Sequence, residues 1–166
     1  MIIISIDPGY ERVGIAVLEK IQGGKETLLY SDCFKTLPKK KMEERIFEIG
    51  SEVKKIIKKY KPEKLAIEKL YFENNQKTAM GVSESRGVII YEGMNASLEI
   101  LEYTPLQIKV AVTGYGKSDK NAVINMVEKL IAIPNKPSTS SGRGKMLDDE
   151  YDAIAIGLTA FAYTRG

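Results

Sequence analysis

The chain lacks several residues and patterns, and each absence limits its chemistry. It contains no histidine, so no imidazole serves as a general base. Its one cysteine, Cys33, has no partner for an intrachain disulfide, which fits a reducing compartment. The longest mostly apolar stretch, Ala153–Tyr163, is far shorter than the ~20 residues that span a bilayer. Met1–Ile6 is neither preceded by a basic segment nor followed by a cleavage site, so we expect no signal peptide and a soluble, cytoplasmic protein.

Length and composition predict a single domain over residues 1–166. The chain has 166 residues and is 43% hydrophobic, which suits one ordinary core. Lys+Arg number 25 against Asp+Glu 22, so the net charge is only +3. Lysines cluster at 39–41, 54–61 and 117–120. Such runs are usually solvated faces, and only their convergence with a site would favour nucleic-acid binding.

The first 36 residues have the patterns of β-strands. Met1–Asp7 is almost continuously apolar and ends at Pro8-Gly9, which predicts a central strand followed by a turn. Two further strands are expected at Arg12–Glu19 and about Thr27–Thr36, joined by a hairpin connection at 22–25. The chain therefore begins with an antiparallel meander.

The rest of the chain alternates between helical and strand patterns. The predicted elements are a helix over Met42–Tyr60, strands at Lys64–Glu68 and Leu98–Tyr103, and helices over Asn75–Ala96, Pro105–Val112 and from the cap Ser118 to about Ile131. A polar stretch at 134–146 predicts a mobile loop, and a nearly all-apolar helix follows it. This order predicts an α/β fold with a mixed five-stranded sheet and helices on both faces.

One predicted helix, Asn75–Ala96, is unusually rich in small residues. It contains Gly81, Gly87 and Gly93, and each glycine weakens a helix by about 1 kcal/mol relative to alanine. We infer that close approach to another element outweighs helix propensity here.

Four acidic residues occupy positions where a carboxylate is awkward. Asp7 and Glu68 each end an apolar strand, and Asp149 and Asp152 lie at the start of the last helix. Two unit charges about 4 Å apart repel by roughly 4 kcal/mol at an effective dielectric near 20. Strands from different parts of the chain can bring Asp7 and Glu68 side by side, and a divalent metal is the natural partner of such a cluster.

Each of these residues also has a purely structural explanation. Asp149 as an N-cap with Asp152 three residues later resembles a capping arrangement. Asp7 before Pro-Gly fits a turn. Glu68 fits an edge-strand charge paired with Lys69.

Seven short motifs occur in order between Ile3 and about Thr159. They are Ile6-Asp7-Pro8-Gly9, Ala66-Ile67-Glu68, Ser85-Arg86-Gly87-Val88, Glu102-Tyr103, Gln107-Ile108-Lys109, Gly114-Tyr115-Gly116-Lys117-Ser118-Asp119-Lys120 and Asp149-x-x-Asp152-Ala153-x-Ala155-Ile156. In this order, and over nearly the whole chain, they resemble the RuvC-type Holliday-junction resolvases.

The resemblance implies a ribonuclease-H-like fold and a homodimer whose two active sites nick opposed strands of a four-way DNA junction. By position, Asp7, Glu68, Asp149 and Asp152 would be metal-binding carboxylates, and helix 75–96 would be the dimer helix. Two Mg²⁺ ions about 3.5–4 Å apart would activate a water and stabilise the leaving oxygen. An all-acidic site suits Mg²⁺, and Mn²⁺ is expected to substitute. The family also implies the RuvA–RuvB branch-migration complex as a partner.

The resemblance further implies contacts with DNA. Lys109 and Lys120 match basic positions near the scissile strand, and Lys117 is expected to add a phosphate contact. Tyr71, with Phe72 beside it, falls where the family carries an aromatic residue that stacks on junction bases. Ordinary solvated lysines and core aromatics are the structural alternatives.

The loop at 134–146 looks longer than usual for the family, which leaves Asp148 as an alternative metal ligand. The spacing between Asp149 and Asp152 favours Asp149.

Three other functions compete with junction cleavage. An actin-like or sugar-kinase-type ATP-binding half domain shares an Ile-Asp-x-Gly loop, but that class needs two such domains. A related nuclease of ribosomal-RNA processing shares the fold and the Asp7 loop, yet does not predict the segment 114–120. A non-catalytic DNA-binding module would not require four carboxylates.

Overall fold

The computed structural model describes residues 1–70, 76–131 and 146–164. In chain order the elements are β1 (Ile2–Asp7), β2 (Arg12–Lys20), β3 (Glu26–Lys35), α1 (Met42–Tyr60), β4 (Lys64–Glu68), α2 (Gln76–Asn95), β5 (Glu99–Tyr103), α3 (Pro105–Thr113), α4 (Lys120–Leu130) and α5 (Asp148–Tyr163). The predicted order of strands and helices is therefore confirmed, with most ends within one residue. The predicted mobile loop, 134–146, lies outside the described residues apart from Met146.

The five strands form one mixed sheet in the order β3-β2-β1-β4-β5. β1 pairs with β2 in antiparallel and with β4 in parallel, and β4 pairs in parallel with β5. The central strand is covered on both faces, which explains its almost unbroken apolar sequence. Since β4 lies between β1 and β5, the explanation of Glu68 as an edge-strand charge is wrong.

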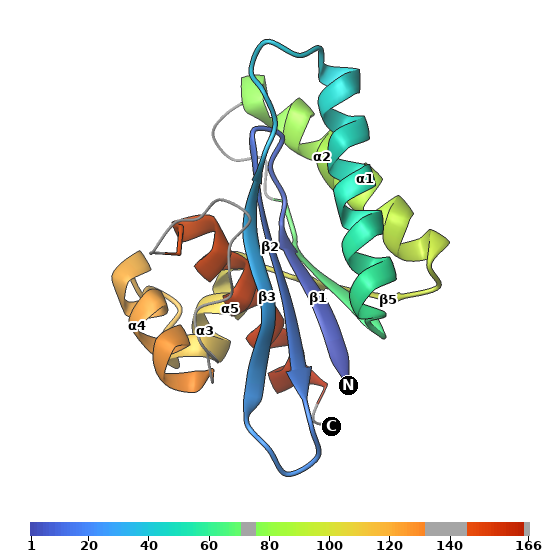
Figure 1. Ribbon diagram of the computed structural model, residues 1–166. Helices are drawn as coiled ribbons and strands as arrows, with labels where there is room; N and C mark the ends of the chain where they lie inside the picture. The colour runs from blue at the N-terminus through green and yellow to red at the C-terminus, as the bar shows by residue number, and fades with distance from the viewer. Residues whose placement is uncertain (71–75, 132–145, 165–166) are drawn as a thin grey trace.

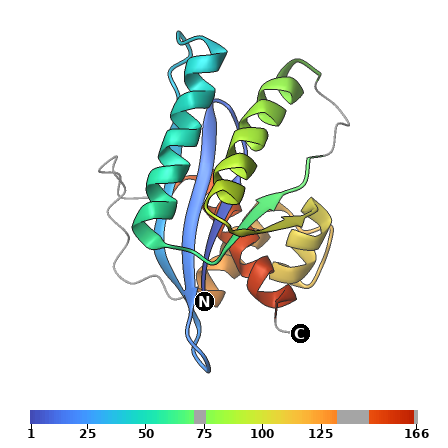
Figure 2. The ribbon, with the colours of Figure 1, turned by 90° about the vertical axis from the view of Figure 1, so that its right-hand side faces the viewer.

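Helices cover both faces of the sheet, as predicted. α1 and α2 lie on one face and α3, α4 and α5 on the other (Figures 1 and 2). Alternate residues of β1 divide between the two cores: Ile3 packs with the α5 side, whereas Ile4 and Ile6 pack with the α1 side. The sheet thus separates two hydrophobic clusters.

α5 and α2 approach the rest of the fold closely where they have small residues. A β-carbon on Gly157 of α5 would lie 2.6 Å from a methyl group of Leu18. On α2, β-carbons at Gly81 and Gly93 would lie 2.9 Å from Tyr10 and from Leu65. The close packing inferred from the glycines of α2 is confirmed at these two positions. None of the helices in the described ranges has the length and apolar composition to cross a bilayer.

The starts of two helices differ from the sequence prediction. α4 is capped by Asp119, whose Oδ1 accepts a hydrogen bond from the backbone N–H of Ala122 at 2.8 Å. Ser118 is not the cap because its hydroxyl donates to the carbonyl of Tyr115 within the preceding turn. α5 begins at Asp148, so Asp149 lies inside the helix and the N-cap explanation of Asp149 is wrong.

Candidate active site

Two of the predicted carboxylates lie side by side at one end of the sheet. Asp7 and Glu68 are the last residues of the parallel strands β1 and β4, whose preceding residues Ile6 and Ile67 are register partners. Parallel strands end at the same edge, so neighbouring terminal side chains converge. The sheet therefore brings these two residues together as expected.

The first turns of α5 bring Asp149 and Asp152 to the same place. Gly14 of β2 is the register partner of Asp7. A β-carbon on Gly14 would lie 2.0 Å from the carbonyl oxygen of Asp149. Only a residue without a side chain lets the start of α5 rest on β2 beside Asp7.

The pKa values of these carboxyl groups show how strongly they interact. The pKa of Asp7 is raised to about 8, mainly by burial and also by the charges of Glu68, Asp152 and Asp149, while the charge of Lys120 opposes the rise. Burial and the charge of Asp152 raise the pKa of Glu68 to about 7. Because each charge disfavours the others, the group favours a cation among its members.

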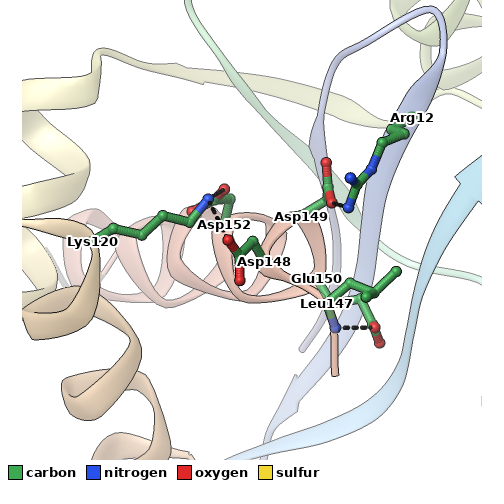
Figure 3. Close-up of polar contacts among 7 residues, drawn as sticks. All are labelled: Arg12, Lys120, Leu147, Asp148, Asp149, Glu150 and Asp152. Atoms are coloured by element: carbon green, nitrogen blue, oxygen red, sulfur yellow. Dashed lines mark hydrogen bonds and ion pairs between the residues drawn. The ribbon is translucent and has the colours of Figure 1, made fainter. Parts of the chain in front are cut away.

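Asp149 is more buried than Asp148, and its charge acts on Asp7. The Asp149 side chain is 20% exposed and pairs with Arg12, whereas that of Asp148 is 65% exposed. The charge of Asp149 affects the pKa of Asp7. Figure 3 shows the two side chains leaving the first turn of α5 in different directions. The geometry favours the assignment based on spacing.

Two cations hold the carboxylates of α5 in the structure. Lys120 Nζ donates to Asp152 Oδ2 at 3.0 Å and lies 3.4 Å from Asp148 Oδ2 (Figure 3). Arg12 of β2 forms an ion pair with Asp149. Within residues 1–70, 76–131 and 146–164, no three Asp, Glu or Cys side chains gather tightly enough to hold one ion as they stand. Arg12 was not singled out from the sequence, where a charge at a strand start is unremarkable.

A buried glutamate anchors the turn that carries these aspartates. Glu150 is only 1% exposed, and its carboxylate accepts hydrogen bonds from Ser31 Oγ at 2.7 Å and from the backbone N–H of Leu147 at 2.8 Å. The bond from Ser31 ties the start of α5 to β3, and the bond from Leu147 closes the first turn of α5. The sequence Asp148-Asp149-Glu150 does not indicate which of the three acidic residues is buried.

A cleft of about 310 Å³ lies beside the carboxylates. Its lining consists of Glu68, Pro105, Ile108, Lys109, Lys120, Val123, Asp152, Ala155 and Ile156. The charge of Lys109 lowers the pKa of Glu68, against the larger effect of burial. Lys109 and Lys120 therefore share one cleft with two of the carboxylates.

Of the other predicted DNA contacts, the structure describes only Lys117. Lys117 is exposed in the turn between α3 and α4 and is not among the described residues that line the cleft. Tyr71 and Phe72 lie outside the described residues.

The sequence matches the family model described as crossover junction endodeoxyribonuclease RuvC over residues 3–160. A relative of that name from Desulforamulus reducens is 38% identical over 158 residues, which are 95% of this chain and 91% of the relative. Another from Prochlorococcus marinus is 42% identical over 159 residues, or 96% of this chain and 97% of the relative.

Solved structures give the same result. The structure of T. thermophilus RuvC in complex with Holliday junction substrate aligns with a TM-score of 0.87 at 27% identity, covering 99% of this chain and 95% of that one. The yeast mitochondrial Holliday junction resolvase Ydc2 aligns with a TM-score of 0.71 over 97% of this chain and 78% of its own, and at 11% identity it supports the fold alone. The predicted ribonuclease-H-like fold is confirmed, and the chain belongs to the RuvC family of crossover junction endodeoxyribonucleases.

Proposed function

We propose that this protein is a metal-dependent endonuclease that resolves four-way (Holliday) DNA junctions by paired symmetric nicks, in homologous recombination and DNA repair. The main support is the group of mutually repelling carboxylates around Asp7, beside a cleft lined by Lys109 and Lys120. Family membership and the likeness to a structure solved with Holliday junction substrate add to it. The ATP-binding, ribosomal-RNA-processing and non-catalytic alternatives have no such support.

The proposed metal ligands are Asp7, Glu68, Asp149 and Asp152. The set fits Mg²⁺, which prefers carboxylate oxygens and retains several waters, so it does not need three side chains on one ion. The raised pKa of Asp7, about 8, also marks a place where a cation relieves repulsion. When bound, two such ions supply water activation and stabilisation of the leaving 3′ oxygen. Mn²⁺ is proposed as a substitute.

The lysines of the cleft are proposed to bind the scissile strand. Lys109 of α3 and Lys120 of α4 line the cleft together with Glu68 of β4 and Asp152 of α5. Their positive charge offsets the repulsion between DNA phosphates and the acidic group. Lys117 is proposed to bind phosphate at the margin of the cleft. Tyr71 and Phe72 stay predicted stacking residues.

A homodimer is proposed through one face of α2. Its exposed stripe consists of Met80, Glu84, Gly87, Tyr91 and Met94. The side chains of Met80, Tyr91 and Met94 are exposed at 71%, 63% and 60%. The five positions of the stripe are spaced alternately by four and three residues, so they form a continuous seam, which suits packing against a two-fold copy. Association with a RuvA–RuvB complex and a cytoplasmic location are proposed from the family.

Cleavage of a synthetic four-way junction with Mg²⁺ tests this function. The wild-type protein should make paired nicks in opposed strands. The variants Asp7→Asn, Glu68→Gln, Asp149→Asn and Asp152→Asn should each abolish cleavage yet bind the junction at least as well, because fewer negative charges repel the phosphates.

Asp148→Asn is the matched control, since Asp148 lies one residue before Asp149 on the same turn and is mostly exposed. It should retain cleavage. Normal nicking by Asp7→Asn would refute the proposed site, and an inactive Asp148→Asn with an active Asp149→Asn would shift the ligand assignment by one residue.

A further inference from the structure

Helix α2 makes a buried contact with the loop that follows Asp7. Ser85 is 0% exposed, and its hydroxyl donates a hydrogen bond to the carbonyl oxygen of Gly9 at 2.7 Å. A serine hydroxyl in a helix usually bonds to its own helix or to water. Here it crosses to a turn two residues beyond a proposed metal ligand.

The next residue of α2 reaches the other strand end. Arg86 Nε donates to the backbone carbonyl of Glu68 at 3.4 Å, and its guanidinium forms an ion pair with Glu102 of β5. Glu102 thereby holds Arg86 against the ends of β4 and β5. Consecutive residues of one helix thus contact the backbones that carry Asp7 and Glu68.

Three further contacts hold the loop after Asp7, one from α2 and two from other parts of the chain. Tyr10 packs against Gly81 of α2, where a β-carbon would lie 2.9 Å from its ring. The Tyr10 carbonyl accepts a hydrogen bond from Thr36 Oγ1 at 2.6 Å, and the Arg45 guanidinium lies 4.8 Å from its ring centroid. The register of β1 and β4 ends at the pair Ile6 and Ile67, so beyond this pair the position of the loop relative to the end of β4 depends also on the contacts made by α2.

We propose that Ser85 and Arg86 are positioning residues of the nuclease, which set the separation of Asp7 and Glu68 through the backbones of Gly9 and Glu68. This inference rests on the proposed role of these two carboxylates as metal ligands. Mg²⁺ requires nearly ideal octahedral geometry at 2.0–2.1 Å, so a small displacement of either strand end weakens metal binding. The same helix carries the proposed dimer seam, so one element would serve both the subunit contact and the site.

Metal affinity measured without DNA tests the inference directly. Ser85→Ala and Arg86→Gln should each lower Mn²⁺ affinity in calorimetry by about tenfold or more, as loss of an outer partner of a metal ligand typically does. Both should raise the Mg²⁺ concentration needed for half-maximal cleavage. Junction affinity in EDTA should not change.

Ser83→Ala is the matched control, because it makes the same chemical change on the same helix, two residues from Ser85. It should leave Mn²⁺ affinity unchanged. A Ser85→Ala protein that melts at a lower temperature but binds Mn²⁺ normally would overturn the inference, since a purely structural role predicts that result. Should Ser85→Ala fail to fold, Arg86→Gln decides, because the Arg86 side chain is partly exposed.

Arg86→Lys separates positioning from charge. Lysine keeps the positive charge beside Glu102 but lacks the planar fork that reaches two acceptors. It should bind Mn²⁺ as weakly as Arg86→Gln, and full recovery would overturn the role of Arg86.

Asp7→Asn distinguishes failure of this inference from failure of the proposed function. If Asp7→Asn loses Mn²⁺ affinity while Ser85→Ala and Arg86→Gln keep it, only the positioning inference is wrong. If Asp7→Asn also binds Mn²⁺ normally, the proposed metal site itself is wrong.

Discussion

α5 and α2 lie on opposite faces of the sheet and contribute to the site by different physical means. α5 is buried along most of its length and carries two of the proposed ligands on its own first turns. α2 carries none of the four, contacts the loop after β1 through Ser85 and the end of β4 through Arg86, and leaves a stripe with Met80, Tyr91 and Met94 exposed. Both helices are held by apolar packing and by close approaches at glycine, but α5 supplies ligands directly, whereas α2 supports the site through polar contacts with backbone carbonyls.

The largest expected effect concerns the contact between α5 and β2. Gly14→Ala places a β-carbon 2.0 Å from the Asp149 carbonyl, which forces the start of α5 off the sheet. We expect a loss of roughly 1–3 kcal/mol in the free energy of unfolding, as for other overpacked sites. Urea unfolding and Mn²⁺ calorimetry measure both effects, with weaker metal binding expected.

Gly24→Ala is the control for that experiment, because its β-carbon would meet its nearest atom at an ordinary 3.4 Å. Equal stability of Gly14→Ala and Gly24→Ala would show that α5 does not depend on the close approach.

The next prediction concerns Asp7 at the end of β1 and the dependence of protein stability on pH. The pKa of Asp7 is raised to about 8, so without metal the folded protein binds a proton that the unfolded chain releases at lower pH. Metal-free stability should therefore be greatest in acid and should fall as pH rises through 8. Each unit of pKa difference contributes about 1.4 kcal/mol, so the loss from pH 5 to 8 is on the order of a few kcal/mol.

Urea unfolding in EDTA at several pH values measures this loss. Asp7→Asn should be less dependent on pH than the wild type and more stable at pH 8, and Mg²⁺ should restore the wild-type protein. A wild-type stability that rises between pH 5 and 8 would contradict the predicted sign.

The outer face of α2 gives a test that does not involve packing inside the subunit. A β-carbon on Gly87 would meet nothing within 4 Å among the described residues, so Gly87→Leu does not clash there. We expect it to keep its melting temperature as a monomer but to weaken association, because a bulky side chain separates the two helices. Analytical ultracentrifugation at micromolar concentration measures the association.

Gly87→Ala is its control, since alanine favours the helix by about 1 kcal/mol and adds only a methyl group. A wild-type protein that sediments as a clean monomer would remove the basis of this prediction.

The smallest expected effect concerns the cleft on the α5 face. Lys109→Ala or Lys120→Ala should reduce the log–log salt slope of junction binding by about 0.9 for each phosphate that the lysine neutralises in the wild-type complex. Lys58→Ala on α1 is the control, because α1 lies on the opposite face of the sheet (Figure 1). An unchanged slope together with full cleavage would identify that lysine as an ordinary solvated residue.

Most elements were predictable because strands and helices each have a characteristic spacing of apolar residues along the sequence. β1 and α1 follow directly from the runs Met1–Asp7 and Met42–Tyr60. Helix starts were less predictable: Ser118 and Asp119 are both good caps, and a competing hydrogen bond in the preceding turn decided between them. The carboxylates Asp7, Glu68, Asp149 and Asp152 were singled out because an acidic residue at either end of an apolar segment is unusual, and their role as metal ligands stays a prediction.

The sequence by itself determined the strands, the helices and the four acidic residues of interest, because local periodicity and burial preference do not depend on distant partners. Only the tertiary structure decided how these parts meet. It paired Asp149 with Arg12, buried Glu150 against Ser31, and joined Ser85 to Gly9. Such contacts join residues 76 or more positions apart, so their energies arise from packing geometry that no local pattern encodes.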